Sequence, residues 1–311
     1  MSSLLYRTLI FTLWFTLISY SYGNVSYGDL YSYQVNSGNT YAGIKGVVPW
    51  GHESMIVLKA NLNSYELGLI GTTTDTTFIS KVKVPNENSN TLLTPAMSID
   101  RKHNLYVLGL SVDNSETTTG CFINKHDIDD NSYSTIFKLS ERNINCILLE
   151  TSNHDQIYLA TDNYVTKKIY LYRLSIRGRL LEKQIIKSPP EHTLRSLSIN
   201  KNNGRVLVTT SNGITYNMYE YNSSGKLRFN SPSLDGLVGD AVYSKDGSLF
   251  VSVIGDGSLE YDSLDCVIHH FDKNKIISSA VISAPPQYEM FRCTINHRLF
   301  WKCIYTSNII Q

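Results

Sequence analysis

The sequence predicts an all-β protein, a six-bladed β-propeller of four-stranded blades. Three observations predict it: a repeat of about 48 residues, short β-type runs that follow polar turns, and an incomplete repeat unit at each end of the chain. Repeats of about 20 to 50 residues are typical of propellers and other arrays, whose units bury their cores against neighbouring units. The 311 residues are 42% hydrophobic and 18% charged, as in an ordinary folded protein.

The repeat is clearest between residues 185–199 and residues 281–295, which align without a gap. A Pro-Pro pair occurs in both segments, and the offset of 96 residues equals two units of 48. Six β-type runs, spaced by a mean of 47 residues, form a second column with the landmark residues Tyr65, Tyr106, Tyr158, Leu207, Phe250 and Phe300. Most of these runs follow a polar turn such as 202–204, which is the pattern of a β-hairpin.

The two ends of the chain indicate how the repeat closes. A third strand follows the landmark strand in the first five units, beginning at Phe78, Cys121, Ile169, Tyr216 and Cys266. The sixth unit has almost no chain behind it, whereas two unpaired β-type runs begin near residues 30 and 39. These runs would complete the last sheet and remove its open edge if the sheets form a ring. We therefore expect residues 30–47, as the third and fourth strands of the last blade, to pair with residues 290–305.

The repeat unit resembles those of secreted β-propeller families, the NHL-like proteins and the bacterial β-propeller repeat proteins. Their unit combines an acid or Asn, a Gly turn, a Tyr-Val-type strand and a strand that ends in Lys-x-Asp, and residues 100–109 and 123–127 carry a similar pattern. The first unit departs from it, because Lys59 stands where the second unit has Asp100, and the sixth unit shortens the turn. The resemblance implies a blade and no particular chemistry.

Residues 1–23 are expected to be a secretory signal peptide. Arg7 supplies the positive residue, residues 9–18 supply the apolar stretch, and small residues precede a cleavage site before Asn24. An uncleaved anchor is the alternative, but ten strongly apolar residues are fewer than the roughly 20 that a spanning helix needs. We expect cleavage to leave a secreted, extracellular single domain, residues 24–311, with no membrane span.

Five cysteines follow the predicted signal peptide, in a compartment that permits disulfides. They are Cys121, Cys146, Cys266, Cys293 and Cys303. Cys293 and Cys303 flank one predicted hairpin and are a candidate disulfide, with two buried thiols as the alternative. Two sequons make Asn24 and Asn222 candidate glycosylation sites if the host is a eukaryote and the sites are exposed.

Charge and motifs exclude several function classes. The net charge is +1, so the clustered cations that bind nucleic acid are not expected. The sequence contains no Gly-x-Ser-x-Gly, His-Glu-x-x-His, Cys-x-x-Cys or phosphate-binding Gly loop. Asp127, Asp129 and Asn131 have the opening spacing of a calcium loop, but the Gly and the closing Glu are missing. His269 and His270 are adjacent on a predicted strand, so their side chains point to opposite faces. We therefore predict no cofactor and no catalytic residues.

The tunnel mouth of a propeller, where loops enter the innermost strands, is the expected place for a ligand. In the repeat alignment Ala96, Ser196, Asp240 and Arg292 share one column, which places Asp240 and Arg292 at the same depth on neighbouring blades. A structural ion pair between these two residues is the alternative. The ligand-binding candidates at this rim are Asp240, Arg292, Arg195, Glu53, Asn145 and His192.

Two functions fit these observations. The first is a secreted, non-enzymatic recognition module for an unidentified protein or glycan ligand, which agrees with the neutral charge and the absent catalytic motifs. The alternative is a metal-dependent hydrolase of the lactonase or gluconolactonase kind, which also has six blades. Its divalent ion, such as calcium, would be held by Glu53, Asn145 and Asp240. Arg195 or Arg292 in the same mouth would repel a cation and favour an anionic ligand.

Overall fold

A computed structural model describes residues 43–306 apart from short gaps, which are residues 51–53, 62–63, 71–76, 84–89, 93–95, 114–116, 131, 245, 255–265, 273–274, 283–288 and 296–300. The predicted signal peptide, Asn24 and the β-type run near residue 30 lie outside the described residues, as does Glu53. All regular secondary structure in the described part is β-strand. No helix in that part is long and apolar enough to cross a membrane.

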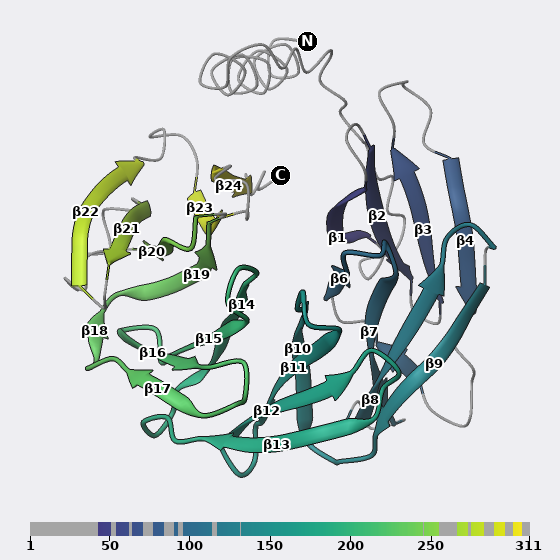
Figure 1. The fold of residues 1–311 in the computed structure, drawn as a ribbon, viewed down its shortest axis with the longest axis horizontal. Helices are drawn as coiled ribbons and strands as arrows, with labels where there is room; N and C mark the ends of the chain where they lie inside the picture. The colour runs from purple at the N-terminus through teal and green to yellow at the C-terminus, as the bar shows by residue number, and fades with distance from the viewer. Residues whose placement is uncertain are drawn as a thin grey trace, which may run out of the picture.

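The described strands form six antiparallel sheets, numbered here in chain order and arranged one after another around a common centre (Figure 1). Sheet 1 contains β1 (Gly43–Trp50), β2 (Ser54–Asn61), β3 (Ser64–Ile70) and β4 (Thr77–Lys83). Sheet 2 contains β5 (Asn90–Leu92), β6 (Met97–Ile99), β7 (Leu105–Val112), β8 (Thr118–Asp127) and β9 (Ser132–Leu139). Sheet 3 contains β10 (Ile144–Thr151), β11 (Gln156–Asn163), β12 (Lys168–Ser175) and β13 (Leu180–Ile186).

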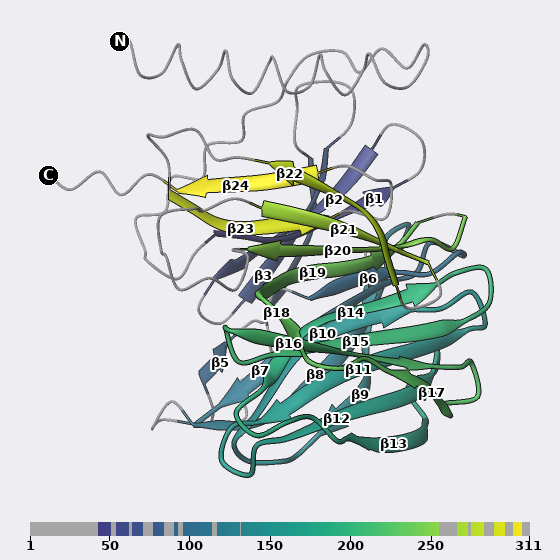
Figure 2. The same cartoon turned by 90° about the vertical axis from the view of Figure 1, so that its left-hand side faces the viewer.

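The remaining sheets continue the series. Sheet 4 contains β14 (Thr193–Asn200), β15 (Arg205–Ser211), β16 (Thr215–Tyr221), β17 (Leu227–Asn230) and β18 (Leu234–Asp235). Sheet 5 contains β19 (Leu237–Tyr243), β20 (Leu249–Ile254), β21 (Cys266–Asp272) and β22 (Lys275–Ile282), and sheet 6 contains β23 (Glu289–Ile295) and β24 (Trp301–Thr306). Strands β1, β6, β10, β14, β19 and β23 are innermost, and each contacts the next. Sheets 5 and 6 lie side by side when the molecule is viewed from the side (Figure 2).

The predicted ring closure is wrong for residues 43–47. These residues belong to β1, which pairs with β2 from Gly43 opposite Ala60 to Trp50 opposite Ser54. A hairpin between adjacent strands closes a short loop, whereas pairing with residues 290–305 would close a loop of more than 200 residues at a larger entropic cost. Residues 43–50 are therefore the innermost strand of sheet 1, and sheet 6 has two described strands.

One landmark of the repeat alignment was also misplaced by a strand. Tyr106, Tyr158, Leu207 and Phe250 lie on the second strands of sheets 2 to 5, but Tyr65 lies on β3, the third strand of sheet 1. Leu58 lies opposite the bulge of β1, as Leu108 lies opposite Ala96 in sheet 2. The residue two positions before Leu58, Ile56 on β2, is therefore the equivalent of Tyr106. Strands β2 and β3 are both apolar and both follow short turns, so the pattern alone did not distinguish them.

The core lies between neighbouring sheets. Four clusters of buried apolar side chains join sheets 1 and 2, 2 and 3, 3 and 4, and 4 and 5. Tyrosine contributes several of the largest fully buried side chains, including Tyr65, Tyr106 and Tyr158. Their rings pack in the core while their hydroxyls bond to polar groups, as Tyr106 Oη does in donating to Asp100 Oδ2 at 3.0 Å. Burial raises the pKa of Tyr106.

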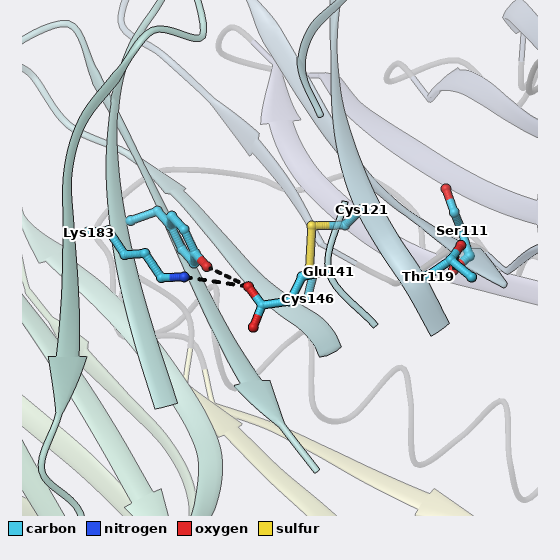
Figure 3. Close-up of a disulfide and its surroundings, with 7 residues drawn as sticks. Ser111, Thr119, Cys121, Glu141, Cys146 and Lys183 are labelled. Carbon is cyan, nitrogen blue, oxygen red and sulfur yellow. Dashed lines mark hydrogen bonds and ion pairs between the residues drawn. A yellow bond between two sulfur atoms is a disulfide. The ribbon is translucent and has the colours of Figure 1, made fainter. Parts of the chain in front are cut away.

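A disulfide joins Cys121 on β8 of sheet 2 to Cys146 on β10 of sheet 3 (Figure 3). Both residues are buried, in the cluster between these two sheets. This pairing differs from the candidate pair Cys293 and Cys303, which remains a prediction. The ladder does place Cys293 directly opposite Cys303 across β23 and β24. Only the backbone of these two strands is described, so the sulfur atoms are not placed.

A buried polar network joins sheets 1 and 2. Tyr65 Oη lies 2.5 Å from His126 Nε2 and accepts a hydrogen bond from Asn124 Nδ2 at 3.0 Å. Thr135 Oγ1 donates to Asn124 Oδ1 at 2.8 Å, and the Tyr133 ring stacks on the His126 ring. His126 is 1% exposed, and burial lowers its pKa to about 4. The neutral imidazole is therefore part of the packed interface.

We expect Gly178→Ala to lower the free energy of unfolding by about 2 kcal/mol, because it combines backbone strain with a steric clash. Gly178 has a φ of 80°, and a Cβ there would lie 1.8 Å from the carbonyl oxygen of Ile136 in sheet 2. Gly213→Ala is the matched control, since Gly213 has a φ of 97° but no atom within 4 Å of a Cβ. Urea unfolding measures the free energy of unfolding of both variants. An equal decrease in both would show that the backbone at Ile136 moves aside to accept the added Cβ.

Candidate functional site

The innermost strands begin at one end of the ring, which we call the mouth, and a β-bulge lies near the start of most of them. The ladder shifts just before Gly46, Leu148, Ser196, Asp240 and Arg292. In sheet 2 the strand divides at this level into β5 and β6, and the Ala96 carbonyl accepts the Leu108 N–H at 3.0 Å. Ala96, Ser196, Asp240 and Arg292 therefore occupy equivalent ladder positions, as they do in the repeat alignment.

Asp240 and Arg292 lie on the neighbouring innermost strands β19 and β23. Asp240 is half-buried, and its Oδ1 accepts the backbone N–H of Ala241 at 2.8 Å. The Asp240 N–H donates to Ser252 Oγ at 2.8 Å, which holds the bulge against β20. Only the backbone of Arg292 is described, so the predicted proximity of the two charges stays a prediction.

His192 is packed inside sheet 4 and does not face the mouth as an open side chain. It is 4% exposed, its Nδ1 lies 3.2 Å from Thr210 Oγ1, and its Nε2 lies 3.3 Å from Thr215 Oγ1. Burial lowers its pKa. These contacts use both ring nitrogens to position the segment that enters β14.

Asn145 and Arg195 meet at Asp162, a residue that the sequence reasoning missed. Asp162 lies near the end of β11, directly opposite Asn145 on β10. The Asn145 side chain, the backbone N–H of Leu194 on β14 and the Arg195 guanidinium all lie near enough to favour its charged form. Arg195 is the bulged residue of β14 and is exposed. Two predicted residues, Asn145 and Arg195, therefore act on one acid between sheets 3 and 4.

The Asp162 carboxylate is only partly satisfied. The residue is 7% exposed, and its buried Oδ1 has no hydrogen-bond partner among the described residues. Burial raises the pKa of Asp162, and the neighbouring Asn145, Leu194, Arg195 and Lys167 act in the opposite direction. Two buried hydroxyls, of Thr161 and Thr118, also have no partner in the described part. An unsatisfied buried acceptor is uncommon in proteins and requires a reason.

A signal for Asp162 was present in the repeat. The equivalent positions of the other second strands are neutral: Ala60, Leu110, Ser211, Ile254 and Thr306. A blade therefore does not need a carboxylate here, and the single charged residue in this column stands out. The signal by which the sequence could have shown Asp162 is therefore one carboxylate in a column of neutral residues.

The turn beside Asp162 presents an anchored aromatic ring. Tyr164 follows β11 and is 39% exposed, and its hydroxyl donates to Asn143 Oδ1 at 3.0 Å. The Tyr164 N–H also donates to the Asn143 carbonyl at 3.0 Å. Val165, next in the turn, is 61% exposed. The two bonds to Asn143 hold the ring in place at the mouth.

The other candidate sites are simpler. Asp127 Oδ1 accepts the N–H groups of Asp129 and Asp130, so its carboxylate caps the turn that carries the calcium-like spacing. His269 Nδ1 lies 2.8 Å from Ser279 Oγ, whereas His270 stacks on Phe250, so the two imidazoles have different surroundings. Among the residues that the structure describes, no three His, Cys, Asp or Glu side chains gather as a metal site would require.

Asn222 lies in the turn between β16 and β17, at the end of the ring opposite the mouth. Its Oδ1 accepts hydrogen bonds from the N–H of Ser224, the hydroxyl of Ser224 and the N–H of Lys226, at 2.8 to 3.1 Å. Ser223 and Ser224 are exposed. A glycan on Asn222 would therefore leave the mouth open, and its attachment stays a prediction.

No family model matches the chain, and no curated protein matches its sequence. Solved structures do match. Hydrazine synthase of Kuenenia stuttgartiensis aligns with a TM-score of 0.56 and 11% identity, over 86% of this chain and 75% of that chain. The Dos1 propeller aligns with a TM-score of 0.52 and 10% identity, over 79% of this chain and 60% of that chain. A protein from Lactobacillus plantarum aligns with a TM-score of 0.50 and 15% identity, over 79% of this chain and 73% of that chain.

These similarities show the fold and nothing more. The chain is a β-propeller, built from sheets that follow one another around a centre. The alignment spans only 60% of the Dos1 propeller chain, and one of the similar structures is named as a synthase while another is named only as a propeller. The fold is therefore shared by proteins with different roles, and function has to be argued from the mouth.

Proposed function

We propose that this protein is a secreted, six-bladed β-propeller that acts as a non-enzymatic recognition module and binds its partner at the mouth. The observation that carries the proposal is the rim of the mouth, where Arg195 on the bulge of β14 and the Tyr164 ring beside β11 are both exposed. The segment before β1 would supply the strands that sheet 6 needs to become a full blade. Residues 43–50 are not part of that closure, since they pair with β2.

Secretion is supported by the disulfide and by the N-terminal sequence. Cys121 and Cys146 form a buried bond between two sheets, and such bonds persist in oxidising compartments. The apolar residues 9–18 behind Arg7 have the pattern of a signal peptide. An extracellular location is consistent with both features.

The contacts at the mouth favour recognition over the metal-dependent hydrolase. A cation site would use oxygens of Asn145 and Asp240 together with Glu53. Asn145 instead lies opposite Asp162 in sheet 3, while Asp240 lies in sheet 5 and accepts a backbone N–H through Oδ1. The positive charge of Arg195 acts on Asp162 and would repel a divalent ion.

The test is affinity capture with the tagged, secreted protein, residues 24–311, on glycan and protein panels. We expect Arg195→Ala and the double variant Asp240→Ala, Arg292→Ala to lose capture. Asp130→Ala is the control, because Asp130 is exposed in a turn at the opposite end of the ring. Full capture by all folded variants would place the binding surface away from the mouth.

Calcium and a chelator separate recognition from metal-dependent hydrolysis. We expect the melting temperature of the protein to be the same in calcium and in EDTA, because the described residues include no gathered set of three acidic, His or Cys ligands. A ligand at 100 times its Kd would stabilise the folded state by about 2.7 kcal/mol, which a thermal melt detects easily. A rise of several degrees in calcium would favour the hydrolase.

A further inference from the structure

We propose that the partner of the mouth is a protein, and that it places apolar and acidic side chains on two turns of sheets 3 and 4. This inference rests on the proposed function, because it names the partner class and the part of the mouth that binds it. The two turns, which we call the paired turns, are residues 164–167 between β11 and β12 and residues 212–214 between β15 and β16. Each joins the second strand of its sheet to the third, so both lie at the mouth of neighbouring blades (Figure 1).

The paired turns expose a β-branched apolar side chain at the same position. Asn163 Oδ1 accepts the Val165 N–H at 3.1 Å, and Asn212 Oδ1 accepts the Ile214 N–H at 3.0 Å. Val165 is 61% exposed and Ile214 is 56% exposed. Turns of this kind favour Gly, Asn, Asp and Ser, so turn chemistry does not require an aliphatic residue in either blade. Side chains of this kind gain about 10-fold in affinity or more when a partner buries them.

Hydrogen bonds fix the shape of both turns. The same two asparagine side chains accept a second backbone N–H, from Thr166 and from Thr215, each at 2.9 Å. The Tyr164 hydroxyl and N–H both donate to Asn143, which holds the ring at the start of the first turn. A surface that is already ordered loses little conformational entropy on binding. The paired turns are therefore suited to present Tyr164 and the two aliphatic side chains to a partner.

Positive charge surrounds the paired turns. Five exposed cations lie at this end of sheets 3 and 4, namely Arg142, Lys167, Lys168, Lys187 and Arg195. The exposed acids described in the same region are Glu191 and Asp235. Arg142 lies 3.9 Å from Asp113 of sheet 2, which leaves an excess of cations at the other positions. Complementary charge speeds association and selects partners, so this excess favours a partner with carboxylates around its apolar contact.

The combination of groups favours a protein over a glycan. An anionic glycan could pair with the cations, but it would leave Val165 and Ile214 without an apolar contact. Sugar rings stack on aromatic faces, and the paired turns offer one aromatic ring beside two aliphatic side chains. Protein interfaces combine a central apolar contact with a polar, charged rim, which is the arrangement that these residues can match.

The experiment selects peptides from a random library displayed on phage, with the secreted protein, residues 24–311, as the immobilised target. We expect the selected peptides to be enriched in Asp and Glu together with apolar residues. The best peptide is synthesised and titrated by calorimetry. The double variant Val165→Asp, Ile214→Asp should bind it at least 10-fold more weakly, because it loses the apolar contact and repels carboxylates.

The matched control is Ile277→Asp, because Ile277 is 56% exposed like Ile214 but lies near the start of β22, at the end of the ring opposite the mouth. It should bind the peptide as the wild type does. The exchanged side chains are exposed in all three positions, so the melting temperatures of the variants should stay close to that of the wild type.

A charge reversal tests the cations separately. Lys168→Glu should weaken binding of the peptide several-fold at low salt, and the difference should shrink as salt is added. Lys226→Glu is its control, since Lys226 is exposed in the turn before β17 at the opposite end. An equal effect of both reversals would assign the charge dependence to the net charge of the protein and would contradict a site at the paired turns.

The outcomes distinguish this inference from the proposed function. A library that yields no binder or only basic binders would overturn the inference, as would a peptide that the double variant binds as tightly as the wild type. Capture of a glycan that Arg195→Ala abolishes, without any peptide binder, would overturn the inference and leave recognition at the mouth standing. Absence of any captured glycan, protein or peptide would overturn both.

Discussion

Removal of the Cys121–Cys146 disulfide is expected to lower the free energy of unfolding by about 3.5 kcal/mol, from the chain entropy of a loop of this length. The two cysteines are 25 residues apart and lie on different sheets, so the bond restricts the unfolded chain and also links sheets 2 and 3. The double variant Cys121→Ala, Cys146→Ala removes the bond without leaving a free thiol. Urea unfolding of the wild type and the variant, both without reductant, measures the difference.

Reductant provides the control for this prediction. Dithiothreitol should bring the wild type to the stability of the double variant and should leave the double variant unchanged if no other disulfide forms. A further loss in the double variant would indicate a second bond, for which the opposed residues Cys293 and Cys303 are the predicted pair. Equal stability of wild type and double variant without reductant would contradict the prediction.

The repeat predicted the positions of strands well in sheets 2 to 5. The second strands of sheets 2 to 5 lie where the landmark residues placed them, and the equivalence of Ser196, Asp240 and Arg292 agrees with the ladders. The prediction failed at the start of the chain, where β1 was assigned to the last sheet. Apolar runs and turns fix where strands occur but carry little information on which neighbour each strand chooses.

The site was less predictable because it depends on contacts between sheets. The place of Asn145 and Arg195 on the rim is a sequence prediction, yet the acid on which both act, Asp162, lies on a second strand. The disulfide partner of Cys146 was equally hidden, since five cysteines allow many pairings and the spacing of Cys121 and Cys146 has no hairpin signature. Such pairings follow from how blades stack, which the sequence of one blade does not encode.

Acidification is expected to destabilise the protein through His126 by about 2 kcal/mol at pH 5 and about 3 kcal/mol at pH 4. Burial lowers the pKa of His126 in the folded state to about 4, whereas an unfolded histidine has a pKa of about 6.5. Between these values the unfolded chain binds the proton and the folded protein does not, so stability falls as the pH decreases from about 7 to about 4. The cost comes from the interface between sheets 1 and 2, where the neutral ring contacts Tyr65 and stacks on Tyr133.

Urea unfolding at pH 7.5 and pH 5 tests this dependence, with His126→Gln as the comparison. The glutamine variant should be less stable at pH 7.5, because it loses the ring contacts. Between pH 7.5 and pH 5 its free energy of unfolding should decrease by about 2 kcal/mol less than that of the wild type, which is the contribution of His126. Comparison at both pH values is needed because other groups titrate in this range. Burial also lowers the pKa of His192 and His269, which destabilises the fold in acid, and raises the pKa of Asp162, which acts in the opposite direction. These contributions are common to both proteins and cancel in the difference. An equal pH dependence of wild type and variant would mean that the loss of stability in acid comes from groups other than His126.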